Sequence, residues 1–123
     1  MSSFKCGPDY IDPMFHSRVI GAKSANLDLF FFGENTLNYL LARNSEGCDI
    51  SVIEGVMGFY DGMGLTSTTV SSYEVAKASR TPVVLVVNAK GASLSVLASI
   101  QGFLCFYFLL LSWLLLILLQ YSG

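Results

Sequence analysis

Two short strings of this sequence combine acidic, basic and glycine residues in a way that suits phosphate and metal chemistry. The first is FKCGPDYIDP at residues 4–13, which places Lys5, Asp9 and Asp12 in a turn-rich segment. The second is VIEGVMGFYDG, in which an apolar run ends on Glu54 and then breaks into glycines. Magnesium prefers carboxylate oxygens, and phosphates bind backbone N–H groups beside a lysine. Together the strings offer the groups that a site for Mg²⁺ and phosphate needs.

Each of these charged residues also has a plain structural interpretation. Asp9 and Asp12 both lie next to or near a proline, a setting typical of turns, although two carboxylates so close repel unless a cation lies near them. Glu54 could be an exposed acid that ends a strand, or a metal-holding strand-end acid of the kind found in phosphate-loop ATPases. Lys5 could be a solvated lysine, or the cation that stabilises a transferring phosphate. The residue types alone leave these alternatives open.

Alternating strands and helices are expected to carry these residues. The predicted elements are a strand end and loop at 4–13, a helix at 34–43, a strand at 49–54, a glycine-rich loop at 55–64, a helix from a capping box at 71–74 to residue 79, a strand at 82–87 and a helix at 93–101. This order predicts an α/β fold with an open, doubly wound parallel sheet. Ligands bind such sheets beyond the carboxyl ends of the strands, so segments 5–12, 54–64 and 88–91 are expected to converge on one edge.

Composition excludes several kinds of partner and site. A formal net charge of -2 and a pI of about 5.1 do not indicate the positively charged surface that binds nucleic acid. The three cysteines have no paired spacing, and the single histidine, His16, cannot complete a Cys/His metal site, so His16 is given no catalytic role. Unpaired thiols, and an N-terminal sequence without the pattern of a secretory signal, predict a cytoplasmic protein.

The two strings closely resemble the signature segments of the cobyrinate a,c-diamide synthase family. The resemblance runs from about residue 4 to 103 and includes SANLD at 24–28 and PVVLVV at 82–87, in the expected order. It implies a fold of the P-loop NTPase, dethiobiotin synthetase-like type. It also implies ATP- and glutamine-dependent amidation of the a and c carboxylates of cobyrinate in cobalamin biosynthesis, through an acyl phosphate.

The resemblance further implies a role for each residue of the two strings. Asp9, Asp12 and Glu54 would hold Mg²⁺ and position the reacting carboxylate, and Lys5 would lie near the γ-phosphate of ATP or the developing acyl phosphate. The residues that would contact the nucleotide are Lys5, Gly55 and Gly58. The implied substrates are cobyrinate and glutamine or ammonia, and the full-length enzyme is expected to form a homodimer. The SANLD string has no role that follows from its residue types.

Two features of the family are missing from this sequence. It contains no phosphate loop of the G-x-x-x-x-G-K-[ST] kind, and the glutaminase nucleophile has no counterpart. These absences predict that residues 1–102 are an internal, partial synthetase domain that is inactive alone. Two other interpretations stay open, namely a dethiobiotin synthetase-like carboxylate-activating ATPase and a non-catalytic, membrane-associated remnant.

The tail at residues 103–123 departs from the family pattern. Residues 103–119 are uncharged and dominated by Leu and Phe, which predicts an apolar C-terminal helix at the lower end of membrane-spanning length. The run could be a membrane anchor, with the basic residues before it keeping the N-terminal part cytoplasmic, or a buried core helix. A frame-disrupted end of a gene is the interpretation we favour, because the composition changes where the family pattern breaks.

Overall fold

The computed structural model describes residues 1–106 and 114–119 of the chain. It forms two units, Met1–Arg80 and Thr81–Gly123, each of which is described by itself. The first unit carries all the residues predicted to form the site, and the second carries the apolar tail.

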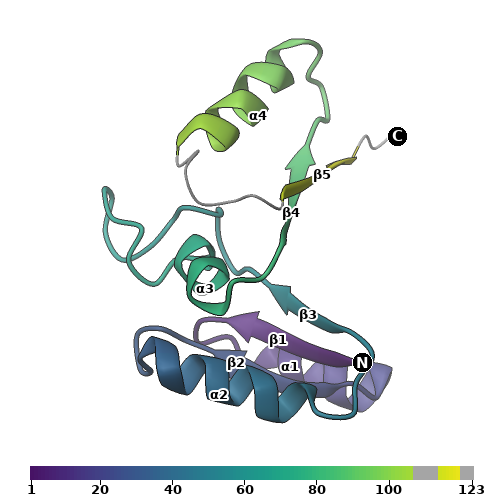
Figure 1. Ribbon diagram of the computed structural model, residues 1–123. Helices are drawn as coiled ribbons and strands as arrows, with labels where there is room; N and C mark the ends of the chain where they lie inside the picture. The colour runs from purple at the N-terminus through teal and green to yellow at the C-terminus, as the bar shows by residue number, and fades with distance from the viewer. Residues whose placement is uncertain (107–113, 120–123) are drawn as a thin grey trace. The chain divides into compact units, whose positions relative to one another are not determined.

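The first unit is built on a parallel three-stranded sheet with the order β2-β1-β3 (Figure 1). Its elements are β1 (Ser2–Cys6), α1 (Ile11–Phe15), the π-helical η1 (His16–Ile20), β2 (Lys23–Leu27), α2 (Glu34–Ser45), β3 (Ser51–Glu54) and α3 (Ser72–Ser79). The chain leaves β1 for a strand on one side and then crosses to the other side for β3. Since such crossovers are right-handed, the two connecting helical segments must cover opposite faces of the sheet.

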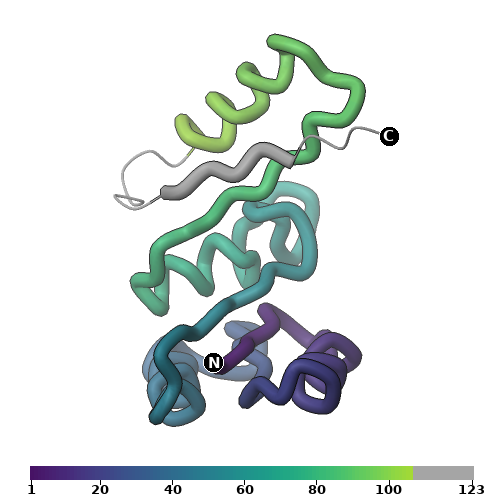
Figure 2. The backbone as a smooth tube through the Cα atoms, turned by 90° about the vertical axis from the view of Figure 1, so that its right-hand side faces the viewer, coloured from purple at the N-terminus to yellow at the C-terminus, as the bar shows by residue number. Residues whose placement is uncertain are grey.

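The residues of β1 alternate between these two faces. Phe4 and Cys6 point into an apolar core that also contains Leu27, Leu37 and Val75, while Ser3 and Lys5 face α1 and η1 through side-chain contacts with His16 and Asp12. Figure 2 shows the strand between the two helical segments. All five residues of β1 are therefore buried, as expected for a central parallel strand.

Most elements predicted for this unit are confirmed. The strand that ends at Glu54 and the helix that begins at Glu34 are present. Ser71 caps α3 by accepting a hydrogen bond from the Glu74 backbone N–H at 3.3 Å, as the capping box predicts. The reciprocal half of that box differs, because the Glu74 carboxylate accepts a hydrogen bond from the Thr68 hydroxyl at 3.1 Å.

Three elements of the first unit, α1, η1 and β2, lie where no regular structure was predicted. The loop expected through Pro13 instead enters α1 at Ile11, and β2 occupies residues 23–27. Pro13 is tolerated because it lies in the first turn of α1, where backbone N–H groups have no partner within the helix. The mixed sequence KSANL of β2 lacks the β-branched residues that mark β3 and β4, so its composition did not indicate a strand.

The second unit pairs β4 (Val83–Asn88) with β5 (Leu114–Leu119) in a parallel ladder, and α4 (Ser95–Phe106) lies between them in the sequence. The strand predicted at 82–87 and the helix predicted at 93–101 are both confirmed. The predicted C-terminal helix is wrong over Leu114–Leu119, because these residues form a strand in register with Val83–Asn88. In a short run where every residue is apolar, hydrophobic periodicity cannot distinguish a buried strand from a buried helix.

Of the rest of that predicted helix, residues 103–106 are helical as part of α4, and residues 107–113 lie outside the described residues. Within the part of the chain that the structure describes, we find no helix with the length and apolar character needed to cross a bilayer. The α/β class with parallel strands is thus confirmed, while the P-loop topology stays a proposal.

Leu37 is the residue through which α2 secures the core behind the site. Its side chain is fully buried against the β1 face that carries Phe4. We expect Leu37→Ala to lower the free energy of unfolding of the first unit by about 2–5 kcal/mol, because it removes buried methyl groups and leaves a cavity. Leu65→Ala is the matched control, since Leu65 is fully exposed and its loss should cost less than about 0.5 kcal/mol. Equal urea midpoints for the two variants would contradict this packing.

Candidate functional site

Three polar residues lie in one row across the carboxyl ends of the sheet. The parallel register places Lys5 of β1 opposite Asn26 of β2 on one side and Glu54 of β3 on the other. Neighbours in register on parallel strands project from the same face, so all three belong to the face that α1 and η1 cover. The predicted convergence of segments 5–12 and 54–64 is confirmed at this point. The 88–91 segment belongs to the second unit, and its convergence stays a prediction.

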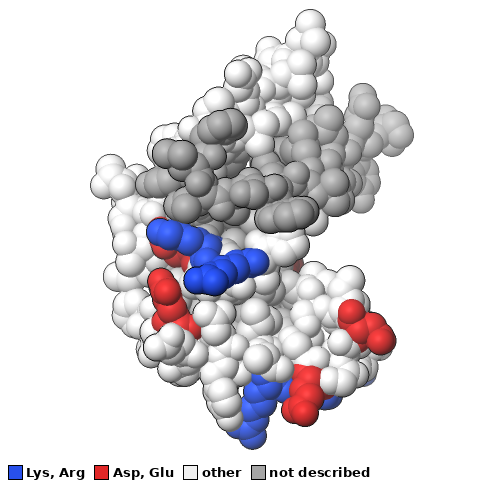
Figure 3. Space-filling view, in the orientation of Figure 1, with Lys and Arg blue, Asp and Glu red and all other residues white. Residues whose placement is uncertain are grey.

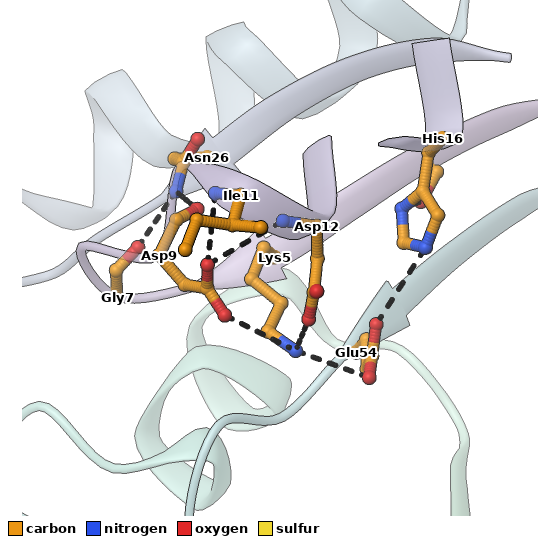
Figure 4. A network of polar contacts seen from close by, with 9 residues as sticks. Lys5, Gly7, Asp9, Ile11, Asp12, His16, Asn26 and Glu54 are labelled. Carbon is orange, nitrogen blue, oxygen red and sulfur yellow. Dashed lines mark hydrogen bonds and ion pairs between the residues drawn. The ribbon is translucent and has the colours of Figure 1, made fainter. Parts of the chain in front are cut away.

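The ammonium group of Lys5 is the centre of a cluster of three carboxylates (Figure 4). Lys5 Nζ lies 2.6 Å from Asp12 Oδ2, 3.0 Å from Glu54 Oε1 and 3.6 Å from Asp9 Oδ2. Only 6% of the Lys5 side chain is exposed, against 42% for Asp12 and 49% for Glu54. The interpretation of Lys5 as a solvated lysine is therefore wrong. The Lys5 ammonium group is buried, whereas the carboxylates that contact it are partly exposed to solvent.

This arrangement shifts the pKa values of the central pair in opposite directions. Burial on its own would lower the pKa of Lys5, but hydrogen bonds and charge from Asp12 and Glu54 outweigh it and raise the pKa to about 12. The hydrogen bond from Lys5, aided by its charge, lowers the pKa of Asp12 below its ordinary value. Both groups stay charged over the whole physiological range, so the cluster is a fixed ion pair there.

Asp9 combines the two roles that its sequence left open. Its Oδ1 accepts a hydrogen bond from the Ile11 backbone N–H at 3.1 Å, which is the turn chemistry expected of an aspartate at this place. Its Oδ2 is the oxygen that faces Lys5. One carboxylate thus starts α1 and contributes negative charge to the cluster.

Asn26 fixes the loop that carries Asp9. Its side-chain amide donates hydrogen bonds to the carbonyl oxygens of Gly7, at 2.8 Å, and of Asp9, at 2.7 Å. Asp28, two residues on, accepts a hydrogen bond from the Phe30 backbone N–H at 2.8 Å and so forms the turn after β2. These contacts give the SANLD string the structural role that its residue types did not reveal, because the partners of Asn26 lie in the loop after β1.

His16 also belongs to the cluster, although sequence reasoning gave it no role. Its Nδ1 lies 2.7 Å from Ser3 Oγ, and its Nε2 lies 3.9 Å from Glu54 Oε2. The sequence held one signal, since His16 follows Asp12 by four residues, the spacing that places two side chains on one helical face.

The two glycines predicted to contact a nucleotide are both closely packed. A Cβ on Gly55 would come within 2.6 Å of Ser72 Oγ, and a Cβ on Gly58 would clash with the Asp61 carboxylate. Close packing therefore explains why each of these two positions is a glycine. Their contact with a nucleotide stays a prediction. Burial in the apolar core also raises the pKa of the Cys6 thiol, to about 11.

The donor set of the cluster fits magnesium. Among the described residues no group of three or more His, Cys, Asp or Glu side chains is placed to hold a metal by itself. Mg²⁺, however, usually binds one or two carboxylates together with phosphate oxygens and water, not a complete protein cage. Asp12 and Glu54 are half-exposed carboxylates whose second oxygens are not bonded to Lys5, so they can serve in such an open site. The metal role of Asp9, Asp12 and Glu54 stays a prediction.

The buried Lys5 cluster contrasts with the ion pairs of the surface. On the face seen in Figure 3, acidic and basic side chains lie beside one another, so this face has a mixed charge. A pair such as Lys77 and Glu74, 3.8 Å apart with 46% of Lys77 exposed, contributes little to stability. Lys5 differs because its burial would be costly without its acidic partners.

The pH dependence of the cluster follows from the two shifted groups. The lowered pKa of Asp12 adds stability above the ordinary carboxyl range, and this stability is lost as the pH falls through the lowered value. The raised pKa of Lys5 adds stability that is complete below pH 10.5 and is lost as the pH rises through about 12.

In the variant Lys5→Met we expect the pKa of Asp12, followed by NMR of its carboxyl group, to rise. Lys23→Met, at an exposed lysine of β2, should leave it unchanged, and an unchanged Asp12 pKa in Lys5→Met would contradict the ion pair.

Comparison with known proteins finds relatives that share most of this chain. A cobyrinate a,c-diamide synthase of Methanocaldococcus jannaschii is 45% identical over 106 residues, which are 86% of this chain and 24% of the relative. One of Caldanaerobacter subterraneus subsp. tengcongensis is 50% identical over 101 residues, 82% of this chain and 22% of the relative. A hydrogenobyrinate a,c-diamide synthase of Streptomyces coelicolor is 46% identical over 103 residues, 84% of this chain and 21% of the relative.

The chain therefore spans about a quarter of the length of the curated relatives that it matches. No protein-family model matches it, and no solved structure does. The resemblance predicted from the two strings is confirmed, and this chain is homologous to one segment of the cobyrinate a,c-diamide synthases.

Proposed function

We propose that the Lys5 cluster is the acidic and cationic part of a site that amidates the side-chain carboxylates of a corrin ring at the expense of ATP. The observation that carries this proposal is the buried Lys5 ammonium, met by carboxylates from β3 and from the start of α1 at the carboxyl edge of a parallel sheet. Ligands bind α/β sheets at this edge. The relatives are named for cobyrinate or hydrogenobyrinate a,c-diamide synthesis, which favours a corrin over a smaller carboxylic acid.

The reaction class explains why a lysine would be held in this way. When ATP and Mg²⁺ are bound, they supply the phosphoryl group that converts a substrate carboxylate into an acyl phosphate, from which ammonia then displaces phosphate. Lys5 carries a permanent positive charge at a fixed point, and such a preorganised cation stabilises negative charge that builds up on transferring oxygens. Its carboxylate partners hold the ammonium in place through contacts at 2.6 and 3.0 Å.

The acidic residues would divide between two tasks. Asp12 and Glu54, the more exposed of the three carboxylates, would hold Mg²⁺ through the oxygens that do not contact Lys5. Asp9, whose Oδ1 accepts a hydrogen bond from the Ile11 backbone N–H, would keep the loop rigid beside Lys5. Gly55 and Gly58 would bring the backbone close to the nucleotide. Ammonia from glutamine, a cytoplasmic setting and a homodimer of the full-length enzyme complete the proposal, and they rest on the family resemblance.

Glu54 offers the sharpest test of the proposed function. In a full-length relative that carries the same residues, numbered as here, we expect Glu54→Gln to lower kcat for diamide formation by about tenfold or more, equivalent to about 1.4 kcal/mol of barrier. The change removes a charge from the metal- and lysine-binding carboxylate with almost no change in volume. Glu34→Gln, at an exposed position in the first turn of α2, is the matched control and should keep wild-type kinetics.

The measurement is the rate of diamide formation with saturating Mg²⁺-ATP, corrin substrate and ammonia, so that the supply of ammonia from glutamine does not enter. Wild-type rates in Glu54→Gln would return Glu54 to a structural role and overturn the proposal.

A further inference from the structure

A continuous line of polar side chains runs beneath the sheet from Ser3 to the carboxylate of Glu54. Ser3 Oγ lies 2.7 Å from His16 Nδ1, and His16 Nε2 lies 3.9 Å from Glu54 Oε2. The other oxygen of Glu54, Oε1, is the one that contacts Lys5. The two oxygens of one carboxylate are thus directed to two different partners, the ammonium on one side and the imidazole on the other (Figure 4).

Two neighbours, Ser3 and Glu54, bear on which imidazole nitrogen of His16 carries hydrogen. Ser3 is 6% exposed, and its hydroxyl lies 2.7 Å from His16 Nδ1, where either atom can donate; the Glu54 carboxylate beside Nε2 favours the arrangement in which Ser3 donates and Nδ1 accepts. With Nδ1 as acceptor, the hydrogen of a neutral ring is on Nε2, which faces the negatively charged Glu54. The opposite tautomer would point an unprotonated Nε2 at a carboxylate oxygen, an unfavourable arrangement of lone pairs.

The backbone of His16 is also fixed. His16 is the first residue of η1, and its carbonyl oxygen accepts hydrogen bonds from the backbone N–H groups of Gly21 and, at 3.1 Å, of Ala22. Single π-helical turns are frequent at functional sites, where they redirect a side chain. The imidazole is therefore held from the backbone side by η1 and from the ring side by Ser3, and only 19% of its side chain is exposed.

We infer that His16 is a positioning residue for Glu54: Ser3 sets its tautomer, and the Nε2–H group holds the second carboxylate oxygen so that the first stays on Lys5. This inference rests on the proposed function, because Glu54 matters to the reaction only if the Lys5 cluster is the amidation site. The contact of 3.9 Å is longer than a direct hydrogen bond, as is common for catalytic contacts without substrate, which tighten in the complex.

The tautomer gives a readout that does not depend on activity. His16 is the single histidine of the chain, so the ¹⁵N signals of its ring need no further assignment. The pH is raised until the ¹⁵N signals of the ring no longer change, and in this neutral form we expect Nδ1 without hydrogen and Nε2 with hydrogen in the wild type. In Ser3→Ala the Nδ1–H form should become populated, whereas Ser24→Ala, the same change on neighbouring β2, should leave the spectrum unchanged. A wild-type ring with hydrogen on Nδ1, or a Ser3→Ala spectrum identical to that of the wild type, would overturn the inference.

The kinetic test compares two replacements of His16 in the full-length relative. A glutamine amide can occupy the place of Nε2, whereas an asparagine amide reaches only the place of Nδ1. We expect His16→Asn to lower kcat by about tenfold with KM for ATP and corrin unchanged, and His16→Gln to stay within about threefold of the wild type. Equal losses in the two variants, or a loss confined to KM, would show that His16 does not act through Glu54.

Failure of this inference can be told apart from failure of the proposed function. If Glu54→Gln is impaired and His16→Asn retains full kcat, the positioning role is wrong while the site assignment stands. If Glu54→Gln keeps wild-type kinetics, the assignment of the site is wrong, and with it the kinetic role inferred for His16.

Discussion

The first unit depends on one constraint, the compensation of a buried positive charge on its central strand. An unpaired ammonium taken out of water would cost several kcal/mol, so Lys5 can lie beneath the sheet only with acidic partners in contact. Those partners come from sequence positions far apart, Asp12 at the start of α1 and Glu54 at the end of β3. Their meeting requires the β1–β3 register and the loop that Asn26 clamps. The geometry of the cluster is thus built into the sheet and not added by a mobile loop.

The pairing of Lys5 with Glu54 can be predicted from the sequence, because the carboxyl ends of parallel strands lie at the same edge of a sheet. Glu54 ends an apolar run and Lys5 lies at a predicted strand end, and this placement is enough to expect them on one edge. His16 and Asn26 escaped prediction for a different reason. Their partners are the hydroxyl of Ser3, the backbone of another loop and a carboxylate across the sheet, and no local pattern of residue types encodes such contacts.

Fold prediction succeeded where hydrophobic pattern and turn chemistry agree, as at the cap formed by Ser71 and in the β-branched run of β4. It failed where composition is ambiguous. The leucine-rich β5 satisfies a helix and a buried strand equally well, and only its parallel pairing with β4 decides between them. The polar β2 shows the converse, since it is a strand because β1 pairs with it and not because of its own propensity.

Because side chains alternate along β1, the register of this one strand determines both the packing of the core and the position of Lys5. Phe4 fills the core on one face, and Lys5 meets the carboxylates on the other. Insertion or deletion of a single residue within β1 would exchange the faces and place an ammonium among apolar side chains and a phenyl ring among carboxylates. A change in the length of β1 by one residue would therefore disrupt the core and the Lys5 cluster at once. Evolution of the site is thus constrained by the packing of the core.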